Sequence, residues 1–189
     1  MICTKLKVIF IHIPRTGGTS IEQALVGKNW WHVERATKHL TWFQARQIYT
    51  EYWDQYLKFS VVRNPWDWMV SLYYAHNYTR SAARGISWRE YVKHPRLASH
   101  EQDTVIQSAI IGSEIDFVLR FENLGPDFKR LCARIGLEAP ELPNYSARSG
   151  RVGLNKQHYS CYYDAELREI IANRHKDDIR RFNYKFEQP

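Results

Sequence analysis

The sequence predicts an α/β fold in three layers, with a parallel sheet flanked by helices on both faces. Short β-branched runs at residues 7–13, 57–62 and 117–119 are typical of buried strands. Segments with helical spacing separate these runs, so crossover connections must join successive strands, as in a parallel sheet. The 189 residues contain no internal repeat, low-complexity tract or linker, and we expect a single domain over residues 1–189.

Start and stop signals indicate where the helices lie. Asn64 and Pro65 combine a capping residue with a proline suited to the first helical position. Ser87-Trp-Arg-Glu90 is a capping-box pattern, and Gly27, Gly112 and Gly136 are expected helix ends. Residues 138–160 are rich in Pro, Ser and Gly, which favours a long irregular segment, and such segments are usually functional or mobile. The expected helices are residues 19–26, 41–53, one from 65 onward, one from 87 onward, 104–111, one ending at Gly136, and 164–182.

The charge balance suits an anionic partner. The 27 Lys and Arg exceed the 20 Asp and Glu, which leaves a formal charge of +7 at pH 7. Nucleic acid, an anionic lipid surface and a ligand bearing phosphate or sulfate all fit this surplus. Acidic residues are interleaved with the basic ones and no basic run stands out, which counts against nucleic acid.

Cysteine usage and hydropathy exclude several classes of protein. Cys3, Cys132 and Cys161 are too few and too scattered for a disulfide framework or a zinc site. The longest apolar stretch near the start, Val8 to Ile13, is far below the ~20 residues of a membrane span, and nothing resembles a signal peptide. We therefore expect a cytoplasmic protein, unless a membrane anchor has been trimmed from the chain.

A glycine-rich turn follows the first expected strand. Ile11-His-Ile-Pro-Arg-Thr-Gly-Gly-Thr-Ser20 aims backbone N–H groups and a helix N-terminus at one point, which favours an anion site over a plain turn. Gly17 and Gly18 allow close approach, and Arg15 supplies fixed charge. The spacing is not the Walker A pattern, which argues against ATP or GTP. Further hydroxyl donors come from Thr16, Thr19 and Ser20.

A second candidate for anion binding follows the second strand. Arg63 stands at its end, and Ser71 lies about two turns along the next helix. Ser71 lies outside the apolar stripe, so it can face a ligand; taken alone it would be an exposed helix serine, and its pairing with Arg63 is what favours a binding role. Arg63 can place two N–H bonds on a phosphate and Ser71 a third, whereas a surface ion pair with Asp67 is the structural alternative. The apolar stripe consists of Trp66, Met69, Val70 and Tyr73.

In chain order these motifs resemble those of the sulfotransferases that use 3′-phosphoadenosine 5′-phosphosulfate (PAPS), in particular the carbohydrate (polysaccharide) branch. Residues 11–20 are similar to the family's 5′-phosphosulfate loop, and residues 59–73 to its 3′-phosphate motif. Residues 119–124 and 162–184 resemble its later landmarks. The resemblance implies a P-loop-NTPase-like sheet. It also implies transfer of a sulfuryl group from PAPS to a hydroxyl, expected on a glycan, with 3′-phosphoadenosine 5′-phosphate (PAP) as product and no metal.

The resemblance also implies roles for individual residues. His39, in Lys38-His-Leu-Thr41, matches the place of the family's general base, with His32 and Glu34 as the alternatives. Arg15 replaces the usual Lys; it can stabilise charge on the leaving oxygen but cannot donate a proton near neutral pH. The residues expected to bind PAPS are Arg15, Thr16, Gly17, Gly18, Thr19, Ser20, Arg63 and Ser71.

The acceptor side is less defined by the sequence. Arg148 and Arg151 fall where the family has a basic stretch that borders the cofactor, and a solvated basic loop is the alternative. Two other functions stay open: an atypical nucleotide-dependent kinase, and a non-catalytic module that binds nucleic acid or an anionic polysaccharide. A sugar-stacking wall is conceivable, although aromatic residues at such spacing are more often core. Its members would be Trp30, Trp31, Trp42 and Trp53.

Overall fold

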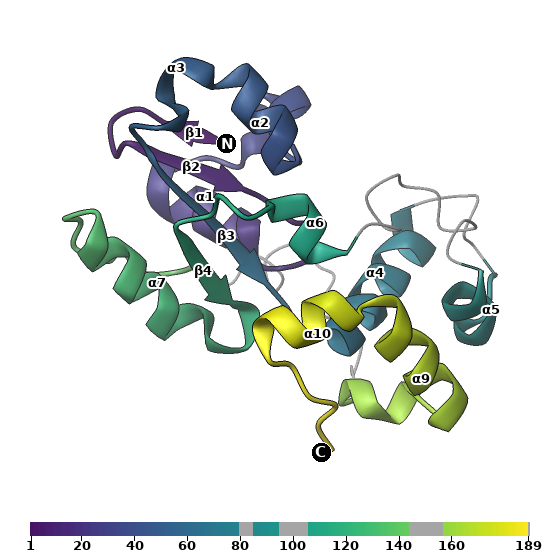
Figure 1. Ribbon diagram of the computed structural model, residues 1–189. Coiled ribbons are helices and arrows are strands. Elements are labelled where there is room, and N and C mark those ends of the chain that lie inside the picture. Colours follow the sequence, from purple (N-terminus) through teal and green to yellow (C-terminus); the bar gives the residue numbers. More distant parts are fainter. Residues whose placement is uncertain (80–84, 95–105, 144–156, 189) are drawn as a thin grey trace. The chain divides into compact units, whose positions relative to one another are not determined.

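A computed structural model describes residues 1–79, 85–94, 106–143 and 157–188 (Figure 1). The chain divides into two compact units. The first comprises residues 1–62 and 110–155, and the second comprises residues 63–109 and 156–189.

The first unit is built on a four-stranded sheet in the order β1-β2-β3-β4. Strands β2, β3 and β4 are parallel, with Phe10 opposite Phe59 and Phe59 opposite Phe117, which confirms the three strands expected from the sequence. The first strand was not predicted: Ile2 pairs antiparallel with Ile9, and two residues are too short to show a period. The strands are β1 (Ile2–Cys3), β2 (Val8–Ile11), β3 (Leu57–Val62) and β4 (Phe117–Arg120).

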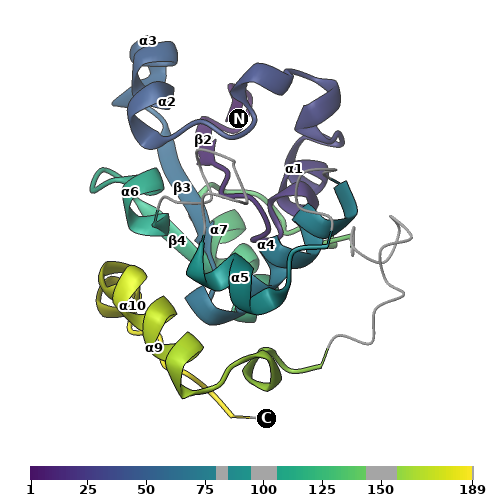
Figure 2. The same cartoon turned by 90° about the vertical axis from the view of Figure 1, so that its right-hand side faces the viewer.

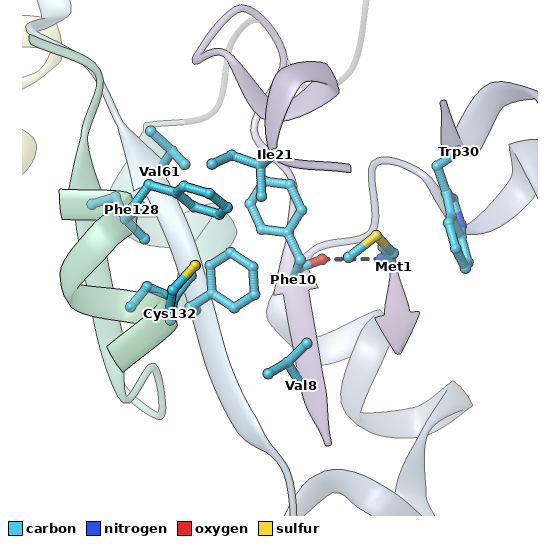
Figure 3. Packing of buried hydrophobic residues seen from close by; sticks show 11 residues of the cluster. Met1, Val8, Phe10, Ile21, Trp30, Val61, Phe128 and Cys132 are labelled. Carbon is cyan, nitrogen blue, oxygen red and sulfur yellow. Dashed lines mark hydrogen bonds between the residues drawn. The ribbon is translucent and has the colours of Figure 1, made fainter. Parts of the chain in front are cut away.

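Both faces of this sheet are buried. Helices α1 (Gly18–Val26) and α7 (Leu124–Arg134) contribute Ile21, Phe128 and Cys132 to one buried cluster, and Figure 3 shows these side chains around Phe10. The Phe10 and Phe59 rings stack there at 4.7 Å. Side chains alternate along a strand, so the buried Ile9, Ile11 and Val62 lie on the opposite face. The result is a mixed α/β fold with a mostly parallel sheet flanked by helices.

The prediction of one continuous helix over residues 41–53 was wrong, because the structure has two helices there. Helix α2 covers Trp42–Ile48 and α3 covers Thr50–Trp53, with Tyr49 at φ −108° and ψ 32° between them. The Thr50 hydroxyl lies 2.9 Å from the carbonyl oxygen of Arg46, where it competes with the helical main-chain bonds. This unit also contains three short helices: η1 (Trp30–His32), η2 (Arg35–Thr37) and η5 (Phe121–Asn123).

The second unit is helical. Helix α4 (Pro65–Thr79) begins where expected, with the Asn64 Oδ1 accepting a hydrogen bond from the Trp66 N–H at 3.1 Å. The capping box predicted at Ser87 is present. The expected helix over residues 164–182 is broken at His175, whose ring lies 3.3 Å from the Asp178 carboxylate, and Figure 2 shows the two parts as separate helices. The other helices are α5 (Trp88–Lys93), η6 (Tyr159–Tyr162), α9 (Ala165–Arg174) and α10 (Lys176–Phe182), and α6 (Gln107–Ile111) spans the boundary between the units.

Candidate active site

The turn between β2 and α1 has an unusual backbone. Arg15 adopts φ 65° and Gly17 φ 85°, both in the left-handed region. Glycine reaches this region freely, whereas for arginine it is uncommon, and such strain concentrates at functional sites. A Cβ at Gly18 would lie 2.2 Å from the His12 Nε2, so a side chain there would collide with the imidazole. Both glycines of the turn are therefore required by its geometry.

The predicted anion-binding side chains divide into two groups within this turn. Arg15, Thr19 and Ser20 are half-buried at the start of α1, where helix N–H groups favour an anion. Within the described helix α1, the first turn carries no acidic residue that would repel an anion. Thr16 is buried, and its hydroxyl donates to the Ile13 carbonyl oxygen at 2.8 Å. The Thr16 hydroxyl therefore stabilises the turn.

A buried ionic cluster lies beneath the turn. The Glu22 carboxylate accepts hydrogen bonds from the His12 Nδ1 at 2.6 Å, the Lys38 Nζ at 2.5 Å and the Trp30 N–H at 3.0 Å. His12, Glu22 and Lys38 are each at most 3% exposed. Burial alone would raise the pKa of Glu22, but the hydrogen bonds and charges of His12 and Lys38 outweigh it and lower that pKa to about 2. Glu22 is therefore ionised at neutral pH.

Replacement of Glu22 by glutamine is expected to destabilise the protein by ~3 kcal/mol, because it leaves the Lys38 ammonium buried without a counter-charge. Urea unfolding measures this change, with Glu51→Gln, at an exposed position, as the matched control. A loss below ~1 kcal/mol would show that the cluster is solvated and contributes little.

His39 contacts this cluster through His12. Its Nδ1 is 3.0 Å from the His12 carbonyl oxygen, which can only accept, so Nδ1 carries the proton and Nε2 bears the lone pair. The His39 ring packs edge-on against His12 at 4.6 Å and against Trp31 at 5.4 Å. Burial, supported by the neighbouring His12 and Lys38, lowers the pKa of His39 to about 3. The imidazole is therefore neutral at pH 7, and the His12 carbonyl oxygen orients its ring.

The two alternatives to His39 as general base are more exposed than His39 itself. The alternative bases His32 and Glu34 are both exposed.

The tryptophans proposed as a sugar-stacking wall are not all at the surface. Trp30 and Trp53 are buried, and their indole N–H groups donate to the Thr37 Oγ1 at 2.9 Å and to the Glu114 Oε2 at 2.7 Å. They belong to the core, so the four tryptophans do not form one wall. Trp31 is 42% exposed and is the tryptophan whose ring contacts His39.

The second unit carries Arg63 and Ser71. Arg63 is 6% exposed, and its Nε and one terminal nitrogen lie 2.7 Å and 2.6 Å from the Asp67 Oδ2. The ion pair considered as an alternative therefore exists, but buried rather than at the surface. A guanidinium has five N–H donors, so this pair is compatible with a phosphate on another edge.

The single apolar stripe expected on α4 was too narrow a description. Trp68 and Leu72 are as buried as Met69 and Val70, and Tyr73 is half-buried. Ser71 is only 5% exposed, so its hydroxyl is enclosed by the helix surroundings. Over residues 65–72, α4 is therefore buried on most of its circumference.

The described part of the chain shows neither a membrane-spanning helix nor a cluster of metal ligands. None of the helices there combines the length and apolar character that a membrane span requires. The same residues contain no group of three or more His, Cys, Asp or Glu side chains placed to hold a metal ion. Arg148 and Arg151 lie outside the described residues.

Comparison with known proteins returned one finding. A family model described as "Sulfotransferase family" matches residues 1–107, which is more than half of the 189 residues. The matched range includes the turn after β2, His39, and the segment that carries Arg63 and Ser71. No curated protein and no solved structure matches the chain significantly.

Proposed function

The chain belongs to the sulfotransferase family, and we propose that it transfers a sulfuryl group from PAPS to a hydroxyl of a carbohydrate acceptor. The observation that carries this proposal is the position of the His39 imidazole, whose Nδ1 lies 3.0 Å from the His12 carbonyl oxygen just before the glycine turn. A base and an anion-binding turn in one unit are what sulfuryl transfer needs on its acceptor and donor sides.

We propose that the turn at residues 12–20 binds the 5′-phosphosulfate, in the manner of a P-loop. In the reaction the acceptor oxygen forms a bond to sulfur while the bond from sulfur to the bridging phosphate oxygen breaks, and PAP leaves. The acceptor proton passes to the His39 Nε2. The Arg15 guanidinium stabilises the negative charge that develops on the bridging oxygen. The helix N-terminus of α1 and the backbone N–H groups of the turn hold the phosphate.

For the other end of the donor, we propose that Arg63 and Ser71 bind the 3′-phosphate. Both are buried side chains with donor groups, and a guanidinium held by Asp67 loses little freedom when it binds a phosphate. Arg148 and Arg151 are proposed as further contacts with the donor phosphates or with an anionic acceptor.

Replacement of Arg63 by alanine is expected to abolish most of a preference for PAP over AMP, because these ligands differ in the 3′-phosphate. A charge-assisted bidentate contact is worth ~1.5–3 kcal/mol, so PAP should bind about 10–100-fold more weakly while AMP is nearly unaffected. Calorimetry with both nucleotides measures this difference.

Two further variants make that comparison specific. Arg180→Ala removes an exposed arginine of the same unit and should leave both affinities unchanged. Arg63→Ala combined with Asp67→Asn removes the repulsion from an unpaired carboxylate, and should still bind PAP weakly. Equal affinity of the unsubstituted protein for PAP and AMP would refute the 3′-phosphate assignment.

A further inference from the structure

The main chain of Arg63 is held by a side chain 44 residues away. The Arg63 N–H donates to the Gln107 Oε1 at 2.8 Å, and the Gln107 Nε2 donates to the Arg63 carbonyl oxygen at 2.8 Å. Gln107 is fully buried. Its carboxamide therefore acts as a strand partner would, satisfying both backbone groups of a residue that lies between β3 and α4.

Gln107 is itself held by Asp178 on α10. The Asp178 carboxylate accepts the N–H of Gln107 at 2.8 Å and the N–H of Ser108 at 2.7 Å, and the His175 Nδ1 lies 3.3 Å from it. Asp178 is fully buried. Burial would raise the pKa of Asp178, but these hydrogen bonds outweigh it and lower that pKa. A buried carboxylate with this many donors is a rigid anchor for the start of α6.

The side chain of Arg63 is fixed at its other end by Asp67. That carboxylate binds the Nε and one terminal nitrogen, so the guanidinium plane is set from the side of α4. Gln107 sets the backbone from which the side chain departs, and Asp67 sets where it ends. Neither contact involves the sheet of the first unit.

We propose that Gln107 is a positioning residue for the 3′-phosphate contact of Arg63, and that Asp178 acts through Gln107. The inference rests on the proposed function, because it assigns Arg63 to the donor's 3′-phosphate. Gln107 then determines the selectivity for a 3′-phosphorylated nucleotide without touching it. A side-chain amide suits this role because it donates and accepts at once, which neither a carboxylate nor an apolar chain can do.

The test measures the ratio of the dissociation constants of AMP and PAP by calorimetry in the full chain. Gln107→Glu keeps the shape but replaces the donor to the Arg63 carbonyl by a carboxylate, and Gln107→Leu removes both bonds. We expect each to lower the ratio about tenfold or more, with AMP affinity nearly unchanged. Asp178→Asn should lower the ratio by a smaller factor, because an amide accepts the two N–H bonds less strongly.

The control for general destabilisation is Leu131→Ala, in the core of the first unit. It lowers stability without touching Arg63, so its ratio should match that of the unsubstituted protein. If Gln107→Leu does not fold, Gln107→Glu and Asp178→Asn carry the test. An unchanged ratio in the folded Gln107 variants would overturn the inference while leaving the proposed function intact. A ratio near one in the unsubstituted protein would instead overturn the role of Arg63, and this inference with it.

Discussion

Replacement of His39 by alanine is expected to lower kcat about 10²–10⁴-fold, because the acceptor proton then has no positioned base. The affinity for PAP should stay nearly unchanged, since the donor contacts proposed for the turn do not involve the His39 ring. Steady-state kinetics and calorimetry on the same preparation separate these two effects. The structure supports this expectation through the Nδ1 contact with the His12 carbonyl oxygen at 3.0 Å.

His32→Ala is the matched control, because His32 is an exposed histidine seven positions earlier in the same unit. It should keep near-normal turnover. Near-normal turnover in His39→Ala would contradict the assignment and transfer the role to His32 or Glu34.

The low pKa of His39 predicts how kcat/KM depends on pH. A His39 pKa of about 3 means that its imidazole stays neutral throughout the range from pH 8 to pH 5. An ordinary histidine, with a pKa near 6.5, would become protonated across that range. The value of kcat/KM for the donor reports the free enzyme, so it should show no fall between pH 8 and pH 5 that is due to His39. An acid limb centred near pH 6.5 would show that His39 is solvated rather than buried.

Replacement of Arg15 by alanine is the second change with a large expected effect. As the sulfuryl group leaves, charge builds on the bridging oxygen, and a cation ~3 Å away gains most at that moment. We therefore expect Arg15→Ala to lower kcat by about two orders of magnitude or more, with a smaller change in KM for PAPS. Steady-state kinetics on the purified variant gives both constants.

Arg15→Lys distinguishes charge from shape at this position. Lysine keeps the cation and is the residue that the family pattern usually has, so activity should be kept or raised. Both side chains tolerate the left-handed φ of 65° equally poorly, so the exchange leaves the backbone strain unchanged. A raised KM with unchanged kcat in Arg15→Ala would mean that Arg15 merely holds the ground-state phosphate.

The fold was predictable where local signals and global packing agree. The runs at 57–62 and 117–119 are strands as expected, and the helix from Gly18 to Val26 ends at Gly27 as its sequence indicates. These signals are strong because buried strands of a parallel sheet are continuously apolar and because glycine readily ends helices.

The failures have local physical causes. The breaks at Tyr49 and His175 are set by side-chain hydrogen bonds, from the Thr50 hydroxyl and between His175 and Asp178, which apolar periodicity does not report. The strand at Ile2 is too short to be seen. Helix α4 was predicted to bury one face only, because the sequence does not show which other segments pack against Trp68 and Leu72.

The candidate site residues were named from the sequence, but the contacts that hold them in place were not. The turn, His39 and Arg63 follow from motifs, whereas the Glu22 cluster and the Gln107 contact with Arg63 join residues far apart in sequence. The one available signal was that Glu22 follows Ile21 within a helical segment and that Lys38 lies two residues before Leu40. Charged residues there are usually solvated, so their pairing becomes evident only in three dimensions.

The most direct test of the central claim is transfer of labelled sulfate from PAPS to a panel of glycans by the purified chain, without added metal. We expect label to appear in at least one glycan in amounts equal to the PAP released, and to fall by about two orders of magnitude or more in His39→Ala and Arg15→Ala. No label in any glycan, from a protein that binds PAP tightly and prefers it to AMP, would contradict the account and favour a non-catalytic anion-binding module.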